Sequence, residues 1–89
     1  MKSRTTRRFR ESFGELPRNI QEKARAAFKV WKTNPYHPSL RFKQVHSDEP
    51  IFSVRIGMGW RALGLRENDT VIWFWVGSHA DYEKLVSRV

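Results

Sequence analysis

The sequence predicts an α+β fold: a helical hairpin packed on a twisted antiparallel sheet of about four strands, followed by a short C-terminal helix. Two observations predict it. Before residue 34, apolar residues recur with the period of an α-helix. After residue 39, many apolar residues alternate with polar ones, as they do in strands. At 89 residues, the chain is expected to form a single domain over residues 1–89.

The main helix is expected from Pro17 to Thr33. Its apolar residues fall at helical spacing on one face: Ile20, Ala24, Ala27, Phe28 and Trp31. Proline is tolerated in the first turn of a helix, and Asn34-Pro35 stops the helix. A shorter helix over Phe9–Leu16 is expected before it, and Arg4–Phe9 is a candidate edge strand.

Four later segments carry the signals of strands: Leu40–Val45, Ile51–Ile56, Trp60–Leu65 and Thr70–Val76. The glycines of Gly57-Met58-Gly59 indicate a turn that joins the second strand to the third. The fourth strand is apolar on both faces, which is typical of a strand in the middle of a sheet. Ser78 is a suitable N-cap for a final helix over residues 78–89.

The charge is strongly positive. Seventeen Lys and Arg against nine Asp and Glu give a net charge of +8 and a pI near 10.6. Such an excess indicates an anionic partner, nucleic acid first. The chain has no cysteine, which excludes disulfides, thiolate zinc sites and a cysteine nucleophile. Its three histidines are scattered without metal-ligand spacing, so no metal or other cofactor is expected.

The charge makes a membrane surface a second possible partner after nucleic acid, but no segment has the pattern of a membrane span or a secretory signal. The longest apolar run, Val71–Val76, is too short to span a bilayer, and no apolar stretch follows the basic N-terminus as a secretory signal requires. A cytoplasmic protein with no membrane partner is therefore expected.

Five residues of the predicted strands and last helix are expected to converge on one concavity: Lys43, Arg55, Arg61, His79 and Tyr82. Three cations suit a phosphodiester, whose transition state gains negative charge. Histidine exchanges protons near neutral pH, and tyrosine donates or orients. Structural interpretations of the same residues remain open. In these, the cations are solvated charges on the strand faces, and His79 and Tyr82 only cap and pack the last helix. His46 lies in a turn, either simply exposed or within reach of the cleft.

Three segments carry the most specific pattern: Phe52–Ile56, Trp60–Gly64 and Trp75–Tyr82. Together with Leu16–Phe28, Asn34–Leu40 and Phe42–Val45, they make nearly the whole chain resemble the RelE/ParE superfamily of toxins from bacterial toxin–antitoxin modules. The fold that this family implies, a helical hairpin on a twisted antiparallel sheet with a final helix, agrees with the elements expected above.

The resemblance implies an enzyme, the toxin of a type II module that cleaves mRNA in the ribosomal A site and so inhibits translation. Cleavage in this family uses the RNA 2′-OH as nucleophile and needs no metal. By resemblance, Arg61 with Lys43 and Arg55 would hold the scissile phosphate. His79 would transfer a proton to the leaving oxygen or from the 2′-OH, and Tyr82 would orient the substrate or support His79.

One departure concerns the general base. YoeB-like members carry a carboxylate just before the lysine equivalent to Lys43, whereas this chain has Leu40, Arg41 and Phe42 there. His79 with Lys43 or His46 would then take the role of base, or the activity is weak. His46 is accordingly a candidate substrate-binding residue.

The resemblance also implies partners: a cognate acidic antitoxin, ribosomal RNA, and operator DNA only through the antitoxin complex. Five basic residues among the first ten would bind ribosomal RNA or form a solubilising tail: Lys2, Arg4, Arg7, Arg8 and Arg10. Two alternatives remain, a ParE-like inhibitor of DNA gyrase without catalysis, and a degenerate toxin that only binds its antitoxin. Arg61 together with His79 and Tyr82 favours the nuclease.

Overall fold

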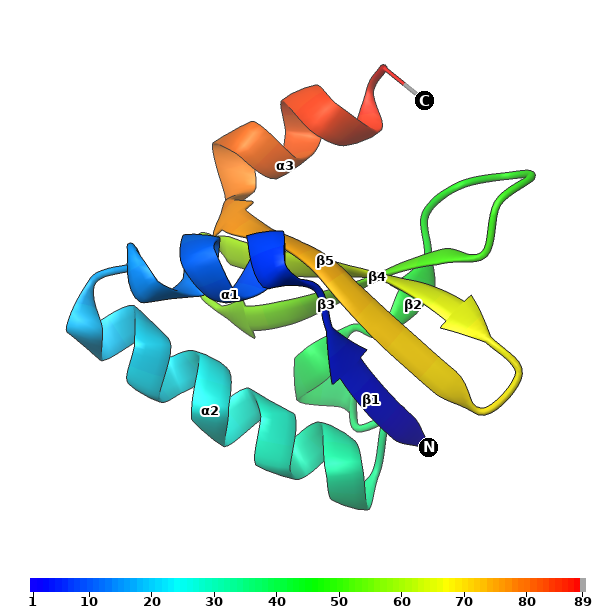
Figure 1. The fold of residues 1–89 in the computed structure, drawn as a ribbon, viewed down its shortest axis with the longest axis horizontal. Helices are drawn as coiled ribbons and strands as arrows, with labels where there is room; N and C mark the ends of the chain where they lie inside the picture. Colours follow the sequence, from blue (N-terminus) through cyan, green and yellow to red (C-terminus); the bar gives the residue numbers. More distant parts are fainter. Residues whose placement is uncertain (89) are drawn as a thin grey trace.

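The computed structural model describes residues 1–88, and within them the chain forms three α-helices and one five-stranded sheet (Figure 1). The elements follow in the order β1 (Lys2–Thr5), α1 (Arg7–Gly14), α2 (Arg18–Thr33), a one-turn 3-10 helix (Pro38–Leu40), β2 (Lys43–Gln44), β3 (Ile51–Gly57), β4 (Trp60–Glu67), β5 (Thr70–Ser78) and α3 (His79–Val86). The predicted α+β architecture is confirmed. No helix in the described part of the chain is long and apolar enough to cross a membrane.

The sheet has the strand order β1-β5-β4-β3-β2. It is a mixed sheet, whereas an antiparallel sheet was expected. Strands β2 to β5 form an antiparallel meander. Strand β1 pairs parallel with β5, with Lys2 opposite Thr70 and Thr5 opposite Trp73. Strand β5 is apolar on both faces, and it lies inside the sheet. One of its edges pairs with β4, and the other pairs with β1.

The N-terminal segment differs from its predicted boundaries. Strand β1 ends at Thr5, and α1 begins at Arg7, so the expected strand over Arg4–Phe9 and helix over Phe9–Leu16 are both shifted. The reason is a helix cap: the Thr6 hydroxyl accepts a hydrogen bond from the backbone N–H of Phe9 at 3.1 Å. The basic residues of this segment therefore belong to an ordered strand and helix rather than to a tail.

The strand expected over Leu40–Val45 is reduced to Lys43–Gln44. The preceding residues form the 3-10 turn Pro38–Leu40, which the His37 side chain caps by accepting from the backbone N–H of Ser39. Arg41 then adopts a left-handed backbone conformation with φ of 47°. A left-handed residue cannot continue a strand, so pairing with β3 starts only at Lys43.

The helices α1 and α2 and the sheet enclose the core. Trp31 of α2 is 1% exposed, and its ring meets those of Phe42 and Trp73 edge-on, with centroids 5.9 and 5.5 Å away. Val54 of β3 and Ala62 of β4 belong to the same buried cluster. Between the helices and this face of the sheet lies an apolar cavity of about 470 Å³.

Two glycines allow close packing around β5. A Cβ on Gly64 would lie 2.4 Å from Cγ1 of Val71 and 2.8 Å from the ring of Trp73. A Cβ on Gly77 would lie 2.7 Å from the ring of Trp75, so the indole covers this glycine. Both positions therefore depend on the absence of a side chain.

Candidate active site

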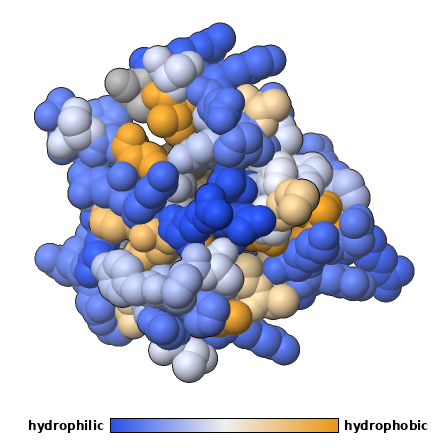
Figure 2. All heavy atoms as spheres, turned by 180° about the vertical axis from the view of Figure 1, so that it is seen from behind, coloured by the Kyte–Doolittle hydropathy of each residue, from blue (hydrophilic) through white to orange (hydrophobic). Residues whose placement is uncertain are grey.

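Basic residues gather on the face of the sheet opposite α1 and α2. Successive strand residues point to opposite faces, so Arg55 and Arg61 point away from the buried Val54 and Ala62. Arg55 and Arg61 are direct partners across β3 and β4, and Lys43 on β2 is the partner of Ser53. The structure thus brings the three predicted cations to one face. Figure 2 shows strongly hydrophilic residues gathered in the middle of the face seen from behind.

Arg61 is the electrostatic centre of this face. One guanidinium nitrogen, Nη1, donates to the carbonyls of Trp60 at 2.8 Å and Gly57 at 3.4 Å, which holds the side chain against the β3–β4 turn. Burial, and next the charge of Arg55, lower the pKa of Arg61. Arg41 lowers it further, whereas Tyr82 and Glu83 act in the opposite direction. The excess of positive charge around Arg61 is the environment that an anionic ligand would stabilise.

Helix α3 brings Tyr82 over the same face. Its first turn is capped by the Ser78 hydroxyl, which accepts from the backbone N–H of Asp81, and the N–H of His79 donates to the carbonyl of Gly59 at 2.7 Å. The Tyr82 hydroxyl donates to Oγ of Ser53 at 3.4 Å, and Ser53 is only 2% exposed. Helix α3 is therefore hydrogen-bonded to the sheet at two points, the β3–β4 turn and the middle of β3.

His79 lies beside Tyr82, with ring centroids 5.7 Å apart. Its Nε2 is 2.7 Å from Oε1 of Glu83, one helical turn further along α3. Its Nδ1 is buried and has no hydrogen-bond partner among the described residues. The structure thus brings together His79 and Tyr82 as predicted, and adds a carboxylate to them.

His46 is placed differently. It lies in the connection between β2 and β3, and its Nδ1 accepts from the backbone N–H groups of Asp48 and Glu49 at 3.1 and 2.9 Å. These bonds shape the turn. Within residues 1–88, no hydrogen bond joins His46 to the cations or to the residues of α3.

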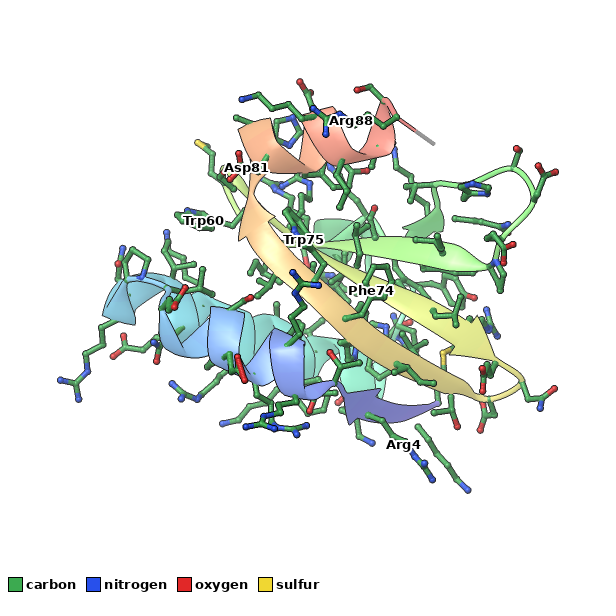
Figure 3. The ribbon with its side chains drawn as sticks, turned by 45° about the horizontal axis from the view of Figure 1, so that its top comes forward. Arg4, Trp60, Phe74, Trp75, Asp81 and Arg88 are labelled. Carbon is green, nitrogen blue, oxygen red and sulfur yellow. The ribbon has the colours of Figure 1, made fainter. Side chains whose placement is uncertain are left out.

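One indole ring lies on the face of the cations. Trp75 lies on β5 beneath α3 (Figure 3), whereas Trp60, near the start of that helix, packs against the core. Gly77, which the indole of Trp75 covers, is the cross-strand partner of Arg61. The site is therefore a basic surface bordered by the indole of Trp75 and partly covered by α3.

The sequence model described as the ParE-like toxin domain matches residues 18–84. The chain belongs to this family. No curated protein sequence matches this ParE-like domain significantly. The match covers α2, the sheet from β2 to β5, and most of α3, so it includes every residue of the basic face.

Solved structures share the fold of this ParE-like domain. The RelB–RelE antitoxin–toxin complex from Methanococcus jannaschii matches with a TM-score of 0.74 and 14% identity, over 92% of this chain and 96% of that one. The isolated RelE toxin of E. coli matches with a TM-score of 0.67 and 13% identity, over 98% and 96%. The YoeB/ParE toxin of Agrobacterium tumefaciens matches with a TM-score of 0.68 and 15% identity, over 89% and 99%. At these identities, the likeness shows the fold.

Three residues of the site in this ParE-like domain were not predicted from the sequence: Arg41, Ser53 and Glu83. In the sequence, Arg41 stands two residues before Lys43, and Ser53 stands two residues before Arg55. Strand alternation alone would therefore place each of them on the same face as its neighbouring cation. Glu83 stands four residues after His79, which is the spacing at which helical side chains meet. Among the described residues, no group of three His, Asp or Glu side chains is arranged to hold a metal ion.

Proposed function

We propose that this ParE-like domain is the toxin of a toxin–antitoxin module and that it is a metal-independent endoribonuclease cleaving mRNA in the ribosomal A site. The observation that carries the proposal is the direct opposition of Arg55 and Arg61 on the sheet face that Tyr82 and His79 border. Cations beside proton-transferring groups are what in-line cleavage of a phosphodiester requires.

The proposed roles follow from position. Arg61, Arg55 and Lys43 bind the scissile phosphate and stabilise the negative charge that develops on it in the transition state. On α3, Tyr82 and the hydrogen-bonded pair of His79 and Glu83 serve the proton transfers of the reaction and orient the RNA. His46 has no role in this proposal, because its Nδ1 is engaged in the β2–β3 turn.

The proposed partners are a cognate acidic antitoxin and the ribosome, so the domain acts in the cytoplasm. The structurally similar chains from Methanococcus jannaschii and Pyrococcus horikoshii belong to RelB–RelE complexes, which supports an antitoxin for this chain. The net charge of +8 suits both an acidic protein and ribosomal RNA. Operator DNA is contacted only through the antitoxin complex in this proposal.

A second candidate is inhibition of DNA gyrase without catalysis. The ParE-like description of the matching family favours it. Under this alternative, the basic face would bind a protein or DNA, and His79 and Tyr82 would only cap and pack α3.

The two functions are separated by inducing the protein in a bacterium and mapping the 5′ ends of transcripts during growth arrest. The nuclease predicts new ends within translated codons, and their loss in Arg61→Ala and His79→Ala. Arg18→Ala is the matched control, because Arg18 is an exposed cation at the start of α2, outside the site. Arrest with intact transcripts and damaged DNA would point to gyrase, whereas absence of arrest would contradict both toxic activities.

A further inference from the structure

The imidazole of His79 has no nitrogen available to accept a proton from a substrate. Its Nε2 lies 2.7 Å from Oε1 of Glu83, and a carboxylate can only accept, so Nε2 carries the shared proton. The other nitrogen, Nδ1, is buried and has no partner within residues 1–88. In this arrangement, one ring nitrogen is hydrogen-bonded to a carboxylate, and the other is shielded from solvent.

Glu83 is the acidic group of α3 that contacts the site residue His79. Its side chain is 68% exposed, and His79 engages Oε1, while no bond to Oε2 is found among the described residues. Its negative charge favours the charged guanidinium of Arg61 and so acts to raise the pKa of that group. What links Glu83 to the site is its contact with His79, whose ring centroid lies 5.7 Å from that of Tyr82. Glu83 also directly follows Tyr82, whose hydroxyl reaches Ser53 on the same face.

We propose that Glu83 is the general base of this site and that His79 is a positioning residue that orients it through the Nε2–H group. The inference rests on the proposed nuclease function, and it assigns the proton acceptor of that reaction. An imidazole that donates to one carboxylate oxygen fixes the direction of the other oxygen, as general-base catalysis requires.

The reaction balances with groups present in the site. Oε2 of Glu83 takes the proton of the RNA 2′-OH, and the 2′ oxygen forms a bond to phosphorus. The bond from phosphorus to the 5′ oxygen breaks, and the Tyr82 hydroxyl protonates this leaving oxygen. Water then returns a proton to Tyr82 and removes the one on Glu83. The products are a 2′,3′-cyclic phosphate and a 5′-hydroxyl end.

The test is Glu83→Gln, which preserves an oxygen to accept from His79 but cannot take a proton. Translating ribosomes are incubated with the purified protein, and the rate of mRNA cleavage is measured. We expect the rate to fall by about 100-fold or more. In the same system, affinity is measured on ribosomes whose A-site codon carries a 2′-deoxy substitution and so cannot be cleaved. We expect this affinity to be unchanged or higher, since a negative charge beside the phosphate is removed.

Asp81→Asn is the matched control, because Asp81 is an exposed acid on the same helix. We expect it to cleave at the wild-type rate, and Glu83→Asp to recover part of the activity lost in Glu83→Gln. The ends of the RNA are analysed for the cyclic phosphate. Thermal unfolding confirms that each variant is folded.

Two outcomes would overturn the assignment of Glu83. One is wild-type cleavage by Glu83→Gln, which would make the His79–Glu83 contact an ordinary surface pair worth a few tenths of a kcal/mol. The other is an equal loss of binding and cleavage, which would make Glu83 a structural residue. Absence of cleavage by the wild-type protein would instead refute the proposed nuclease function itself, so the two failures are distinguishable.

Discussion

Arg55 and Arg61 are direct cross-strand partners, so two guanidinium groups project side by side from β3 and β4. Like charges placed directly opposite each other in an antiparallel pair destabilise a sheet. Burial adds to the effect at Arg61, whose pKa is lowered by desolvation first and by Arg55 second. This part of the sheet is therefore less stable than it would be with an uncharged pair at these two positions. A bound anion would offset the repulsion between the two guanidinium groups.

Replacing Arg55 is expected to stabilise the free protein. In Arg55→Gln, the free energy of unfolding should rise by roughly 0.2–1 kcal/mol, because the repulsion with Arg61 is gone. Urea denaturation at low salt measures the change. Added inorganic phosphate should stabilise the wild-type protein more than the variant, because the variant binds the anion less tightly.

Arg66→Gln is the contrasting variant on the same sheet. Arg66 donates to the Tyr36 hydroxyl at 3.0 Å and lies over the ring of Phe52 at 5.5 Å, so its loss should lower stability. A lower stability of Arg55→Gln than of the wild type would show that the opposition of the two arginines does not weaken the sheet.

The Tyr82 hydroxyl is expected to matter more for cleavage than for stability. Its bond to Ser53 is long, at 3.4 Å, so Tyr82→Phe should reduce the free energy of unfolding by about 1 kcal/mol or less. Cleavage of mRNA should fall by at least about 100-fold, since a proton donor is removed. Thermal unfolding and the ribosome assay give the two quantities. A parallel loss in both would assign Tyr82 to packing alone.

Gly64 is expected to tolerate no side chain. Gly64→Ala would place a methyl group 2.4 Å from Val71, within the pair of strands β4 and β5, and should cost about 1–3 kcal/mol of stability. Gly14→Ala is the control, because nothing lies within 4 Å of a Cβ there. That substitution should leave the protein equally or more stable. Equal unfolding midpoints for the two variants would contradict the close packing around Gly64.

RNA binding by the basic face is expected to depend on salt. Each phosphate contact releases counterions, so affinity should fall linearly on a log–log plot against salt concentration. Lys43→Gln should reduce the slope by about 1, because one cation on the site face is removed. Fluorescence anisotropy with a labelled oligonucleotide measures both slopes. An identical slope in the variant would exclude a phosphate contact by Lys43.

Much of the fold could be predicted because its signals are local. The apolar stripe that ends at Trp31 identified α2, and alternation within Ile51–Ile56 identified β3. The parallel pairing of Lys2–Thr5 with β5 could not be predicted, because no local pattern specifies a partner so distant in the chain. The left-handed conformation of Arg41 was also missed, since most positions of this kind are set by the surrounding structure.

Five of the predicted site residues were found on strand faces and in the first half of α3, where spacing alone determines direction, whereas His46 was found in the β2–β3 turn. The contribution of Ser53 depends on a helix crossing the sheet, so it follows from tertiary packing rather than from spacing. Glu83 had the right spacing to meet His79, but the same spacing occurs in many solvated helical pairs. Only the buried Nδ1 and the packing of His79 beside Tyr82 distinguish this pair from those.

The pairing of β1 with β5 also has a consequence for biosynthesis. Strand β1 lies beside a strand that is synthesised much later, with α1, α2 and the rest of the sheet between them in the chain. Contacts between such distant segments form slowly, because a long loop must close before they stabilise anything. A ribosome making this domain therefore releases α1, α2 and the strands β2 to β4 before β1 can dock, and the sheet is completed only after β5 has been synthesised.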